Sequence, residues 1–355
     1  MSSWETRVRK VAPYTPGKQP KTGRIIKLNT NENPYPPSPK VEEVLRSADY
    51  SILRRYPDPA SGELVSAIAK AYGVGTENVF VGVGSDDVLA MSFQTFFHSD
   101  TQILFPDITY SFYDVWAAAF EIPYRIVPLR EDFSVAAEDY LVPNGGIVIP
   151  NPNAPTGMDA GEGVLQKIIA ENRDSVIIID EAYIDFGGKS VLPLIREYEN
   201  LLVVRTVSKS RALAGSRIGY ALGSQKLISY LNNYRNAFNS YTMDSLTQKI
   251  GVAAFSDMSY YETRTEQIIA TREQSKKRLA ELGFSFMDSK ANFIFATHKD
   301  VPAIEIFDAL EKEGIFVRHF KQPRIENFLR ISIGTEEEMD TLFSFLKRYL
   351  SDSKK

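Results

Sequence analysis

The stretch Val176-Ile177-Ile178-Ile179-Asp180-Glu181-Ala182-Tyr183 places four apolar, β-branched residues directly before a polar turn. A short apolar run without alternating polar residues is typical of a strand that is buried on both faces. A second run of this kind, Leu201-Leu202-Val203-Val204, lies 25 positions further along the chain. The pattern predicts a mostly parallel sheet with helices on both sides. Further short apolar runs cover 79–83, 102–105, 124–128, 147–150 and 218–222.

Helix-like stretches separate these runs, and strands that alternate with helices are typical of an α/β, doubly wound domain. After residue 250 the pattern changes to a long amphipathic segment at 260–282, followed by short strands and helices, which predicts a smaller α+β domain. The first 40 residues hold seven prolines and predict an extended arm. We therefore expect an N-terminal arm in 1–40 that packs on the small domain or on a partner chain, a large domain in 41–250 and a small domain in 251–355.

The composition argues against several classes of protein. A net charge of −4, with both signs interspersed, argues against a nucleic-acid partner. There are no cysteines, and the three histidines, His98, His298 and His319, lie far apart in sequence, so we expect no metal site. No apolar run is long enough to span a membrane, and residues 1–7 do not resemble a signal peptide. The expected location is the cytoplasm.

Polar side chains follow four of the predicted strands. Ser85 follows the run at 79–83, Asn153 follows 147–150, Asp180 follows 176–179 and Lys209 follows the run at 201–205. Ligands of an open α/β sheet bind beyond the carboxyl ends of its strands. We therefore expect these four residues to lie close together.

Lys209 and Asp180 indicate a carbonyl cofactor. An ammonium at the end of a buried strand is desolvated, which makes the amine nucleophilic and suits Schiff-base chemistry on pyridoxal phosphate. A buried carboxylate at Asp180 would be costly alone, but the N–H of a pyridine ring would pair with it. Tyr183 and Asn153 could donate to the phenolate oxygen of that ring. Taken alone, Asp180 and Glu181 favour a helix N-cap and a surface acid, but beside Lys209 and Asn153 the cofactor interpretation is preferred.

A second group of residues suits the phosphate of this cofactor. Gly84 and Ser85 open a predicted helix, whose free N–H groups favour an anion. Thr206 and Ser208 add hydroxyls, and Arg217 adds a charged guanidinium group that can bind two oxygens at once. Tyr110, after the run at 102–105, could stack on the pyridine face or pack in the core.

Together these segments resemble the class II aminotransferases of fold type I, and within them the histidinol-phosphate aminotransferases. The resemblance covers essentially the whole chain. The motifs that carry it are Leu28-Asn29-Thr30-Asn31-Glu32-Asn33-Pro34, Arg55-Tyr56-Pro57-Asp58, Gly84-Ser85-Asp86-Asp87, the segments 151–157 and 208–217, Asp180-Glu181-Ala182-Tyr183, and Phe328-Leu329-Arg330-Ile331-Ser332-Ile333-Gly334.

The resemblance implies a role for each candidate residue. Lys209 would form the Schiff base with pyridoxal 5′-phosphate and shuttle the substrate proton, while Asp180 would pair with the pyridine nitrogen. Tyr56 would reach the phosphate site of the neighbouring subunit in a homodimer. Arg318 and Arg330 would hold the anionic end of the substrate, with Tyr14 and Asn29 of the arm nearby. The remaining cofactor-binding residues would be Ser85, Asp86, Tyr110, Asn153, Tyr183, Thr206, Ser208 and Arg217.

The same resemblance implies a ping-pong transamination of L-histidinol phosphate with 2-oxoglutarate, in histidine biosynthesis. An aromatic amino acid aminotransferase and a threonine-phosphate decarboxylase are alternatives with the same fold. A non-catalytic regulator of this fold is disfavoured because Lys209 is present, and an oxidoreductase because no strand is followed by a full dinucleotide-binding glycine motif. The chain departs from the family pattern at Pro36, Arg55, Asp87, Ala154 and Ser210.

Overall fold

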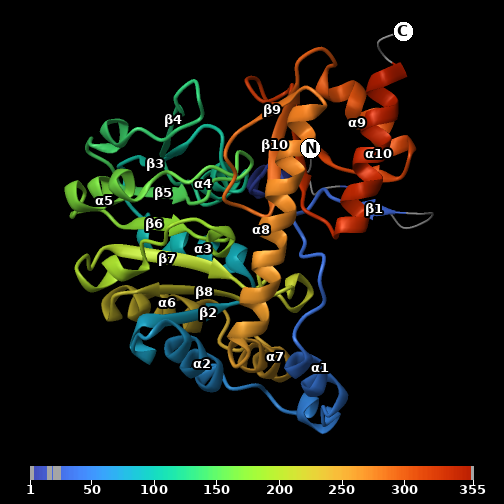
Figure 1. Ribbon diagram of the computed structural model, residues 1–355. Helices are drawn as coiled ribbons and strands as arrows, with labels where there is room; N and C mark the ends of the chain where they lie inside the picture. Colours follow the sequence, from blue (N-terminus) through green and yellow to red (C-terminus); the bar gives the residue numbers. More distant parts are fainter. Residues whose placement is uncertain (1–3, 14–17, 19–24, 353–355) are drawn as a thin grey trace.

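The computed structural model describes residues 4–13, 18 and 25–352 (Figure 1). Its largest sheet has seven strands in the order β2-β8-β7-β6-β5-β3-β4. β8 runs antiparallel to both of its neighbours, and the other pairings are parallel. The predicted α/β class with a mostly parallel sheet is confirmed. The strands are β2 (Val79–Gly82), β3 (Ile103–Pro106), β4 (Tyr124–Val127), β5 (Gly146–Pro150), β6 (Ile177–Asp180), β7 (Leu201–Thr206) and β8 (Gly219–Gly223).

Helices cover both faces of this sheet, which explains why its central strands carry no polar alternation. Ile177 and Ile179 of β6 pack into one apolar core, and Ile178 packs into another on the opposite face. Burying one such side chain stabilises the fold by about 1.5–3 kcal/mol. The first face carries α2 (Gly62–Tyr72), α5 (Glu162–Glu171) and α7 (Ser245–Phe255), and the second carries α3 (Ser85–Phe96), α4 (Tyr113–Ala119) and α6 (Gln225–Phe238).

A second, antiparallel sheet has four strands in the order β12-β13-β10-β9. The long helix α8 (Met258–Glu281) runs from α7 to this smaller sheet (Figure 1). The smaller sheet has an apolar core of its own with α9 and α10. The strands of this sheet and the two helices that pack on it are β9 (Phe284–Phe286), β10 (Phe293–His298), α9 (Ala303–Lys312), β12 (Arg318–His319), β13 (Leu329–Ser332) and α10 (Glu336–Asp352).

Residues 25–33 of the arm lie against the smaller sheet. β1 (Ile26–Lys27) pairs in parallel with β11 (Ile315–Phe316), and the carbonyl of Leu28 accepts a hydrogen bond from the amide of Ser332 (3.0 Å). Beyond Asn33, whose side chain donates to the carbonyl of Lys209 (2.9 Å), the chain crosses to the large sheet. The arm therefore contacts both sheets beside Lys209.

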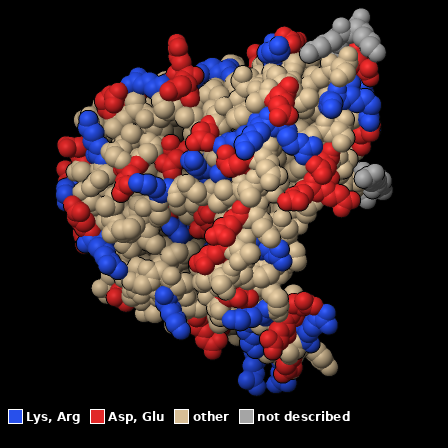
Figure 2. Space-filling model, viewed as in Figure 1, with Lys and Arg blue, Asp and Glu red and all other residues tan. Residues whose placement is uncertain are grey.

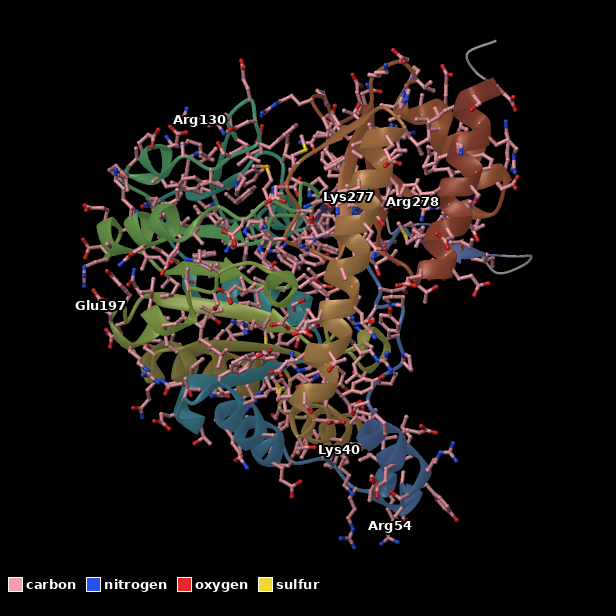
Figure 3. The ribbon with its side chains drawn as sticks, in the orientation of Figure 1. Lys40, Arg54, Arg130, Glu197, Lys277 and Arg278 are labelled. Atoms are coloured by element: carbon pink, nitrogen blue, oxygen red, sulfur yellow. The ribbon has the colours of Figure 1, made fainter. Side chains whose placement is uncertain are left out.

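After the arm, α1 (Pro39–Arg46) and a short 3₁₀ helix (Tyr50–Arg54) project from the body of the molecule (Figure 1). Lys40 ties the base of this projection to the end of α7 through the carbonyl of Ser256 (2.7 Å), and Arg54 lies at its outer end (Figure 3). The surface elsewhere is mixed in charge, with basic and acidic side chains interspersed over the face in Figure 2. Within the described residues, no helix combines the length and the apolar character that a membrane span requires.

Candidate active site

A cavity of about 170 Å³ lies beyond the carboxyl ends of β5, β6 and β7. This is the edge of an open α/β sheet where ligands bind. Nine residues that the sequence predicted for one site line this cavity together. They are Ser85, Asp86, Tyr110, Asp180, Tyr183, Thr206, Ser208, Lys209 and Arg217.

Asn153 was also predicted to bind the cofactor, but it is not part of this lining. Its side-chain amide nitrogen donates to the carbonyl of Ile108 (2.9 Å) and to Oγ1 of Thr156 (3.1 Å), so it has no donor left for a ring oxygen. The next residue, Ala154, lines the cavity instead. These contacts do not support the expected hydrogen bond from Asn153, because the turn at 151–157 presents the neighbouring position, which carries only a methyl group.

Lys209 follows β7 and reaches the arm across the cavity. Its Nζ donates to the carbonyl of Thr30 (3.3 Å) and lies 5.6 Å from the centre of the Tyr183 ring. The carbonyl of Lys209 accepts from the side chain of Asn33 (2.9 Å). The backbone of Lys209 is thus held by the arm, while its amine extends along the cavity wall.

Asp180, the last residue of β6, is 5% exposed. Its Oδ2 accepts from the Tyr113 hydroxyl (2.9 Å), and its Oδ1 accepts from the amide of Ala182 (3.1 Å). Burial raises the pKa of Asp180 to about 6; these two hydrogen bonds lower it in part, and the charges of Asp86 and Glu181 raise it. Asp180 has no ion pair within the described residues, so the site suits a cationic ring nitrogen.

Tyr113 is a site residue that the sequence did not reveal. It is fully buried, its hydroxyl pairs with Asp180, and burial raises its pKa well above the usual value. The predicted helix at 110–120 begins only at Tyr113, since Ser111 and Phe112 form a turn. That turn lets Tyr110 line the cavity while Tyr113 points beneath it. Their spacing of three residues was the signal available in the sequence.

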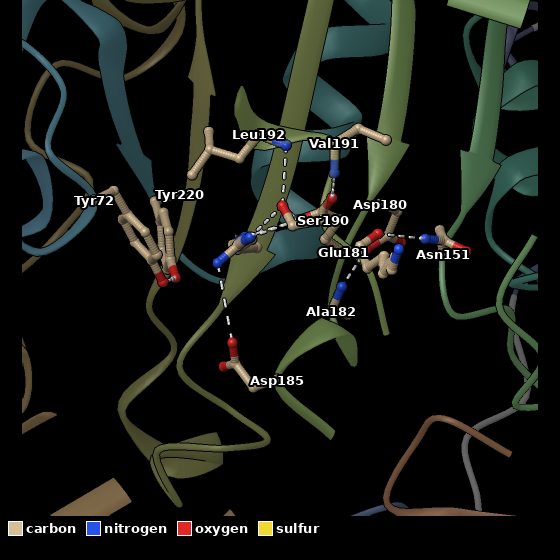
Figure 4. Close-up of polar contacts among 12 residues, drawn as sticks. Tyr72, Asn151, Asp180, Glu181, Ala182, Asp185, Ser190, Val191, Leu192 and Tyr220 are labelled. Atoms are coloured by element: carbon tan, nitrogen blue, oxygen red, sulfur yellow. Dashed lines mark hydrogen bonds and ion pairs between the residues drawn. The ribbon is translucent and has the colours of Figure 1, made fainter. Parts of the chain in front are cut away.

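Glu181, next to Asp180, forms a buried ion pair with Arg205 of β7 (Figure 4). Nε and Nη2 of Arg205 donate to the same carboxylate oxygen at 2.9 and 2.7 Å. The other carboxylate oxygen accepts from the amide of Val191 (2.8 Å). Interpreting Glu181 as a surface acid is therefore wrong: its hydrogen bonds hold the end of β6 against β7 and keep Asp180 in place.

The N-terminus of α3 forms the anion-binding part of the cavity. Gly84 precedes the helix with φ of 92° and no side chain to cap it, so the first amides stay available. The positive φ explains the glycine, because residues other than glycine rarely adopt this backbone conformation. Arg217 is half exposed and lies 3.6 Å from the Asp86 carboxylate. On the other wall, the Thr206 and Ser208 hydroxyls are 2.9 Å apart.

Tyr110 borders both parts of the cavity. Its hydroxyl donates to Oδ1 of Asp86 (2.7 Å), and its ring packs against those of Phe112, Tyr113 and Trp116. A ring held in this way at the cavity wall is suited to stacking on a flat aromatic ligand.

The two predicted substrate arginines are direct neighbours on the smaller sheet. Arg318 of β12 lies opposite Arg330 of β13 in the register, so both side chains leave the same face. Nη2 of Arg330 donates to the carbonyl of Asn29 (3.1 Å), and the next carbonyl, that of Thr30, accepts from Lys209. Arg330 and Lys209 therefore contact adjacent carbonyls of the arm.

Like Asn153, the two arginines and two further described residues, Asn29 and Tyr56, lie outside the cavity lining. Asn29 is buried in the arm, where its side-chain nitrogen donates to the carbonyl of Lys18 (2.8 Å). Tyr56 is 82% exposed and packs on the ring of Tyr241, 4.6 Å away. Tyr14 falls outside the described residues.

The comparison with protein families decides what kind of protein carries this site. The model of the family "Aminotransferase class I and II" matches residues 23–346. The chain belongs to the class I and II aminotransferases. The predicted family is thereby confirmed.

Relatives of this aminotransferase narrow the group. It is 51% identical to the histidinol-phosphate aminotransferase of Clostridium acetobutylicum, over 98% of this chain and 99% of that protein. It is 49% identical to the histidinol-phosphate aminotransferase of Lactococcus lactis subsp. cremoris, over 99% of each.

Solved structures share the fold of this aminotransferase. Histidinol-phosphate aminotransferase from Sinorhizobium meliloti in complex with pyridoxal-5′-phosphate superposes with a TM-score of 0.83 at 24% identity, covering 92% of this chain and 91% of that one. A solved structure of a histidinol-phosphate aminotransferase from Clostridium acetobutylicum, 22% identical to this chain, gives a TM-score of 0.82, with 92% and 99% covered. These likenesses agree with the predicted α/β fold.

Proposed function

We propose that this aminotransferase binds pyridoxal 5′-phosphate in the cavity and transfers the amino group of L-histidinol phosphate to 2-oxoglutarate in a ping-pong reaction. The observation that carries the proposal is the convergence of Lys209, Asp180 and the amide-rich start of α3 on one cavity. The names of its relatives at 51% and 49% identity support the substrate.

The residues present fit the cofactor. A pyridinium N–H would pair with the buried Asp180 carboxylate and remove the burial penalty that raises its pKa. The phosphate would take the free amides of α3, the guanidinium group of Arg217 and the hydroxyls of Thr206 and Ser208. The Tyr183 hydroxyl would donate to the ring oxygen. Ala154 adds no donor there, so we no longer assign that role to Asn153.

Bound pyridoxal phosphate would supply an aldehyde that condenses with amines and a ring that accepts electrons from the substrate Cα. Within the chain, Nζ of Lys209 would hold the cofactor, then take the Cα proton of the amino donor and deliver it to the C4′ carbon of the cofactor, as base and then acid. Asp180 would keep the ring nitrogen protonated. Arg318 and Arg330 would hold the phosphate of one substrate and the carboxylate of the other in turn.

The substrate is tested by adding candidate amino donors to the cofactor-loaded enzyme and following the visible absorbance of the cofactor in the first half-reaction. We expect histidinol phosphate to react at least about tenfold faster than phenylalanine, tyrosine or threonine phosphate. A preference for phenylalanine or tyrosine would instead identify an aromatic amino acid aminotransferase. Release of carbon dioxide from threonine phosphate would identify a decarboxylase.

Arg330→Ala is expected to lower kcat/KM for both histidinol phosphate and 2-oxoglutarate by about 10- to 150-fold, since hydrogen bonds to charged groups contribute about 1.5–3 kcal/mol. Steady-state kinetics with each substrate varied in turn measures this. Arg278→Ala is the control, because Arg278 pairs with Asp340 at the surface, between α8 and α10 (Figure 3). If Arg330→Ala leaves both constants unchanged, Arg330 has no part in the site.

We also propose that the enzyme is a homodimer in which Tyr56 contributes to the phosphate site of the partner. The supporting observation is a group of exposed apolar side chains on and beside the α1 projection, a kind of surface that marks protein interfaces. The group comprises Tyr50 (85% exposed), Leu53 (65%), Tyr56 (82%), Phe238 (69%) and Tyr241 (47%).

A mixture of two inactive variants tests the shared site. Chains carrying Tyr56→Ala and chains carrying Lys209→Ala would be unfolded and refolded together, then assayed at limiting cofactor. If Tyr56 acts across the interface, half of the dimers contain one intact site, and activity returns to about a quarter of the wild-type value. If Tyr56 acts within its own chain, no mixed dimer has an intact site and no activity returns. The same variants refolded separately are the control.

Finally, we propose that the domain boundaries lie at residues 40 and 250. The two separate apolar cores support a large and a small domain. The pairing of β1 with β11 supports an arm that packs on the small one.

A further inference from the structure

Asn31 lies between the smaller sheet and Tyr183, and the function assigned to the site so far does not use it. It is 1% exposed and has a left-handed backbone, with φ of 54°. Its backbone amide donates to Oγ of Ser332 (2.9 Å), and its carbonyl accepts from the side chain of Asn292 (3.0 Å). Its side-chain nitrogen donates to the Tyr183 hydroxyl (2.9 Å). Every polar group of Asn31 is therefore engaged.

Ser332 fixes which end of the Asn31 side chain faces Tyr183. Because Oγ of Ser332 already accepts from the backbone amide of Asn31, its own hydrogen goes to Oδ1 of Asn31 (3.1 Å). The oxygen of the amide is thus held on the Ser332 side. The NH₂ group is left to point at Tyr183, as a donor that cannot accept.

This donor determines where the Tyr183 proton can go. A phenolic hydrogen lies in the plane of the ring, at one of two positions. When a donor from another residue occupies one of these positions, the phenolic hydrogen takes the other. The Tyr183 ring packs edge-on against Phe293, with centroids 5.2 Å apart, which favours the orientation seen here. Tyr183 lines the cavity, so its proton is directed into it.

We propose that Asn31 is a positioning residue that directs the Tyr183 hydroxyl proton to the ring oxygen of bound pyridoxal phosphate. The inference rests on the proposed cofactor. It fixes the direction in which the Tyr183 hydroxyl donates, at a site where Ala154 supplies no donor. The direction of the Tyr183 hydroxyl also depends on the strand that carries Arg330, because Ser332 is two residues further along β13.

The test is the pH at which the visible absorbance of the bound cofactor changes, as the nitrogen that joins it to Lys209 gains or loses a proton. A hydrogen bond to the ring oxygen stabilises the negative charge of that oxygen. The oxygen then attracts the proton on the nitrogen less strongly, so the nitrogen loses this proton at a lower pH. Asn31→Gly removes the donor and keeps the left-handed backbone, which glycine adopts readily. We expect the midpoint to rise by about one pH unit, a tenfold change in the protonation constant.

Asn31→Asp is the matched variant of the same size, with an acceptor in place of the donor, and we expect a larger rise. In a Tyr183→Phe background, Asn31→Gly is expected to cause no further shift, because the hydroxyl through which it acts is gone. Ser332→Ala frees the side-chain amide of Asn31 to turn, and we expect it to raise the pH midpoint by a smaller amount. This variant replaces the Asn31 variants as the test if they do not fold.

Two outcomes overturn the inference while leaving the cofactor in place. One is a wild-type midpoint in Asn31→Gly, or in Ser332→Ala if that is the variant that folds. The other is a shift that persists in the Tyr183→Phe background. Failure of the proposed function looks different, because the wild-type protein would then develop no visible absorbance when pyridoxal phosphate is added.

Discussion

Replacing Lys209 with alanine is expected to abolish covalent retention of pyridoxal phosphate and to lower transamination by roughly four orders of magnitude. The side chain combines two tasks, attachment of the cofactor and transfer of the Cα proton. Within the described residues its amine makes one long hydrogen bond, to the carbonyl of Thr30 at 3.3 Å. Removing it should therefore leave the fold intact.

The measurement is the mass of the denatured protein after borohydride reduction, together with turnover. Wild-type protein should gain the mass of one cofactor per chain and Lys209→Ala none. Lys277→Ala, at an exposed position on α8 (Figure 3), is the control and should behave as wild type. Partial rescue by a small primary amine would show that the loss is chemical. Full transaminase activity in Lys209→Ala would show that the assignment is wrong.

Asp180→Asn is expected to have opposite effects on activity and on stability. Turnover should fall by roughly three orders of magnitude, because a neutral amide does not hold a proton on the ring nitrogen. The cofactor-free protein should become more stable above pH 6. Burial raises the pKa of Asp180 from 3.8 to about 6, so the folded state binds this proton more tightly than the unfolded chain.

The sign of the pH dependence follows from that difference. Between about pH 4 and pH 6 the folded protein holds more protons than the unfolded one, so its unfolding free energy falls as the pH rises. About two pKa units correspond to at most about 3 kcal/mol. The neutral amide of the Asp180→Asn variant does not titrate, so this variant should be more stable than wild type at pH 8 and lose its advantage below pH 4.

Urea unfolding of the cofactor-free proteins from pH 4 to pH 8 measures the effect. Tyr113→Phe is the companion variant: without the hydroxyl that donates to Oδ2, the pKa of Asp180 should rise further and the loss of stability should extend to higher pH. Equal stability of wild type and Asp180→Asn at every pH would mean that Asp180 is not a buried charge in the folded protein.

The patterns of single segments account for most of the fold. Ile177, Ile178 and Ile179 are apolar on both sides of the strand, and the strand proves to be buried on both faces, because a doubly covered sheet has no polar side to display. The carboxyl-end position of Asp180 and Lys209 follows from the same pattern, since parallel strands end at one edge. Nine of the predicted site residues meet in the cavity for this reason.

Contacts between distant segments account for the rest. Tyr113 and Asp180 are 67 residues apart, and Asn31 and Ser332 are 301 apart, so no local pattern connects them. The turn at 151–157 decides that Ala154 and not Asn153 faces the cavity, and adjacent positions in a turn cannot be told apart by residue type alone.

The sequence by itself determined the fold class, the family and the lysine and carboxylate at the centre of the site, because hydrophobic periodicity and strand-end polarity are local properties. Only the tertiary structure decided which hydrogen bonds tune those groups. The Tyr113 hydroxyl on Asp180 and the Asn31 amide on Tyr183 depend on side-chain direction at short range, which is set by the packing of the arm, the helices and both sheets together.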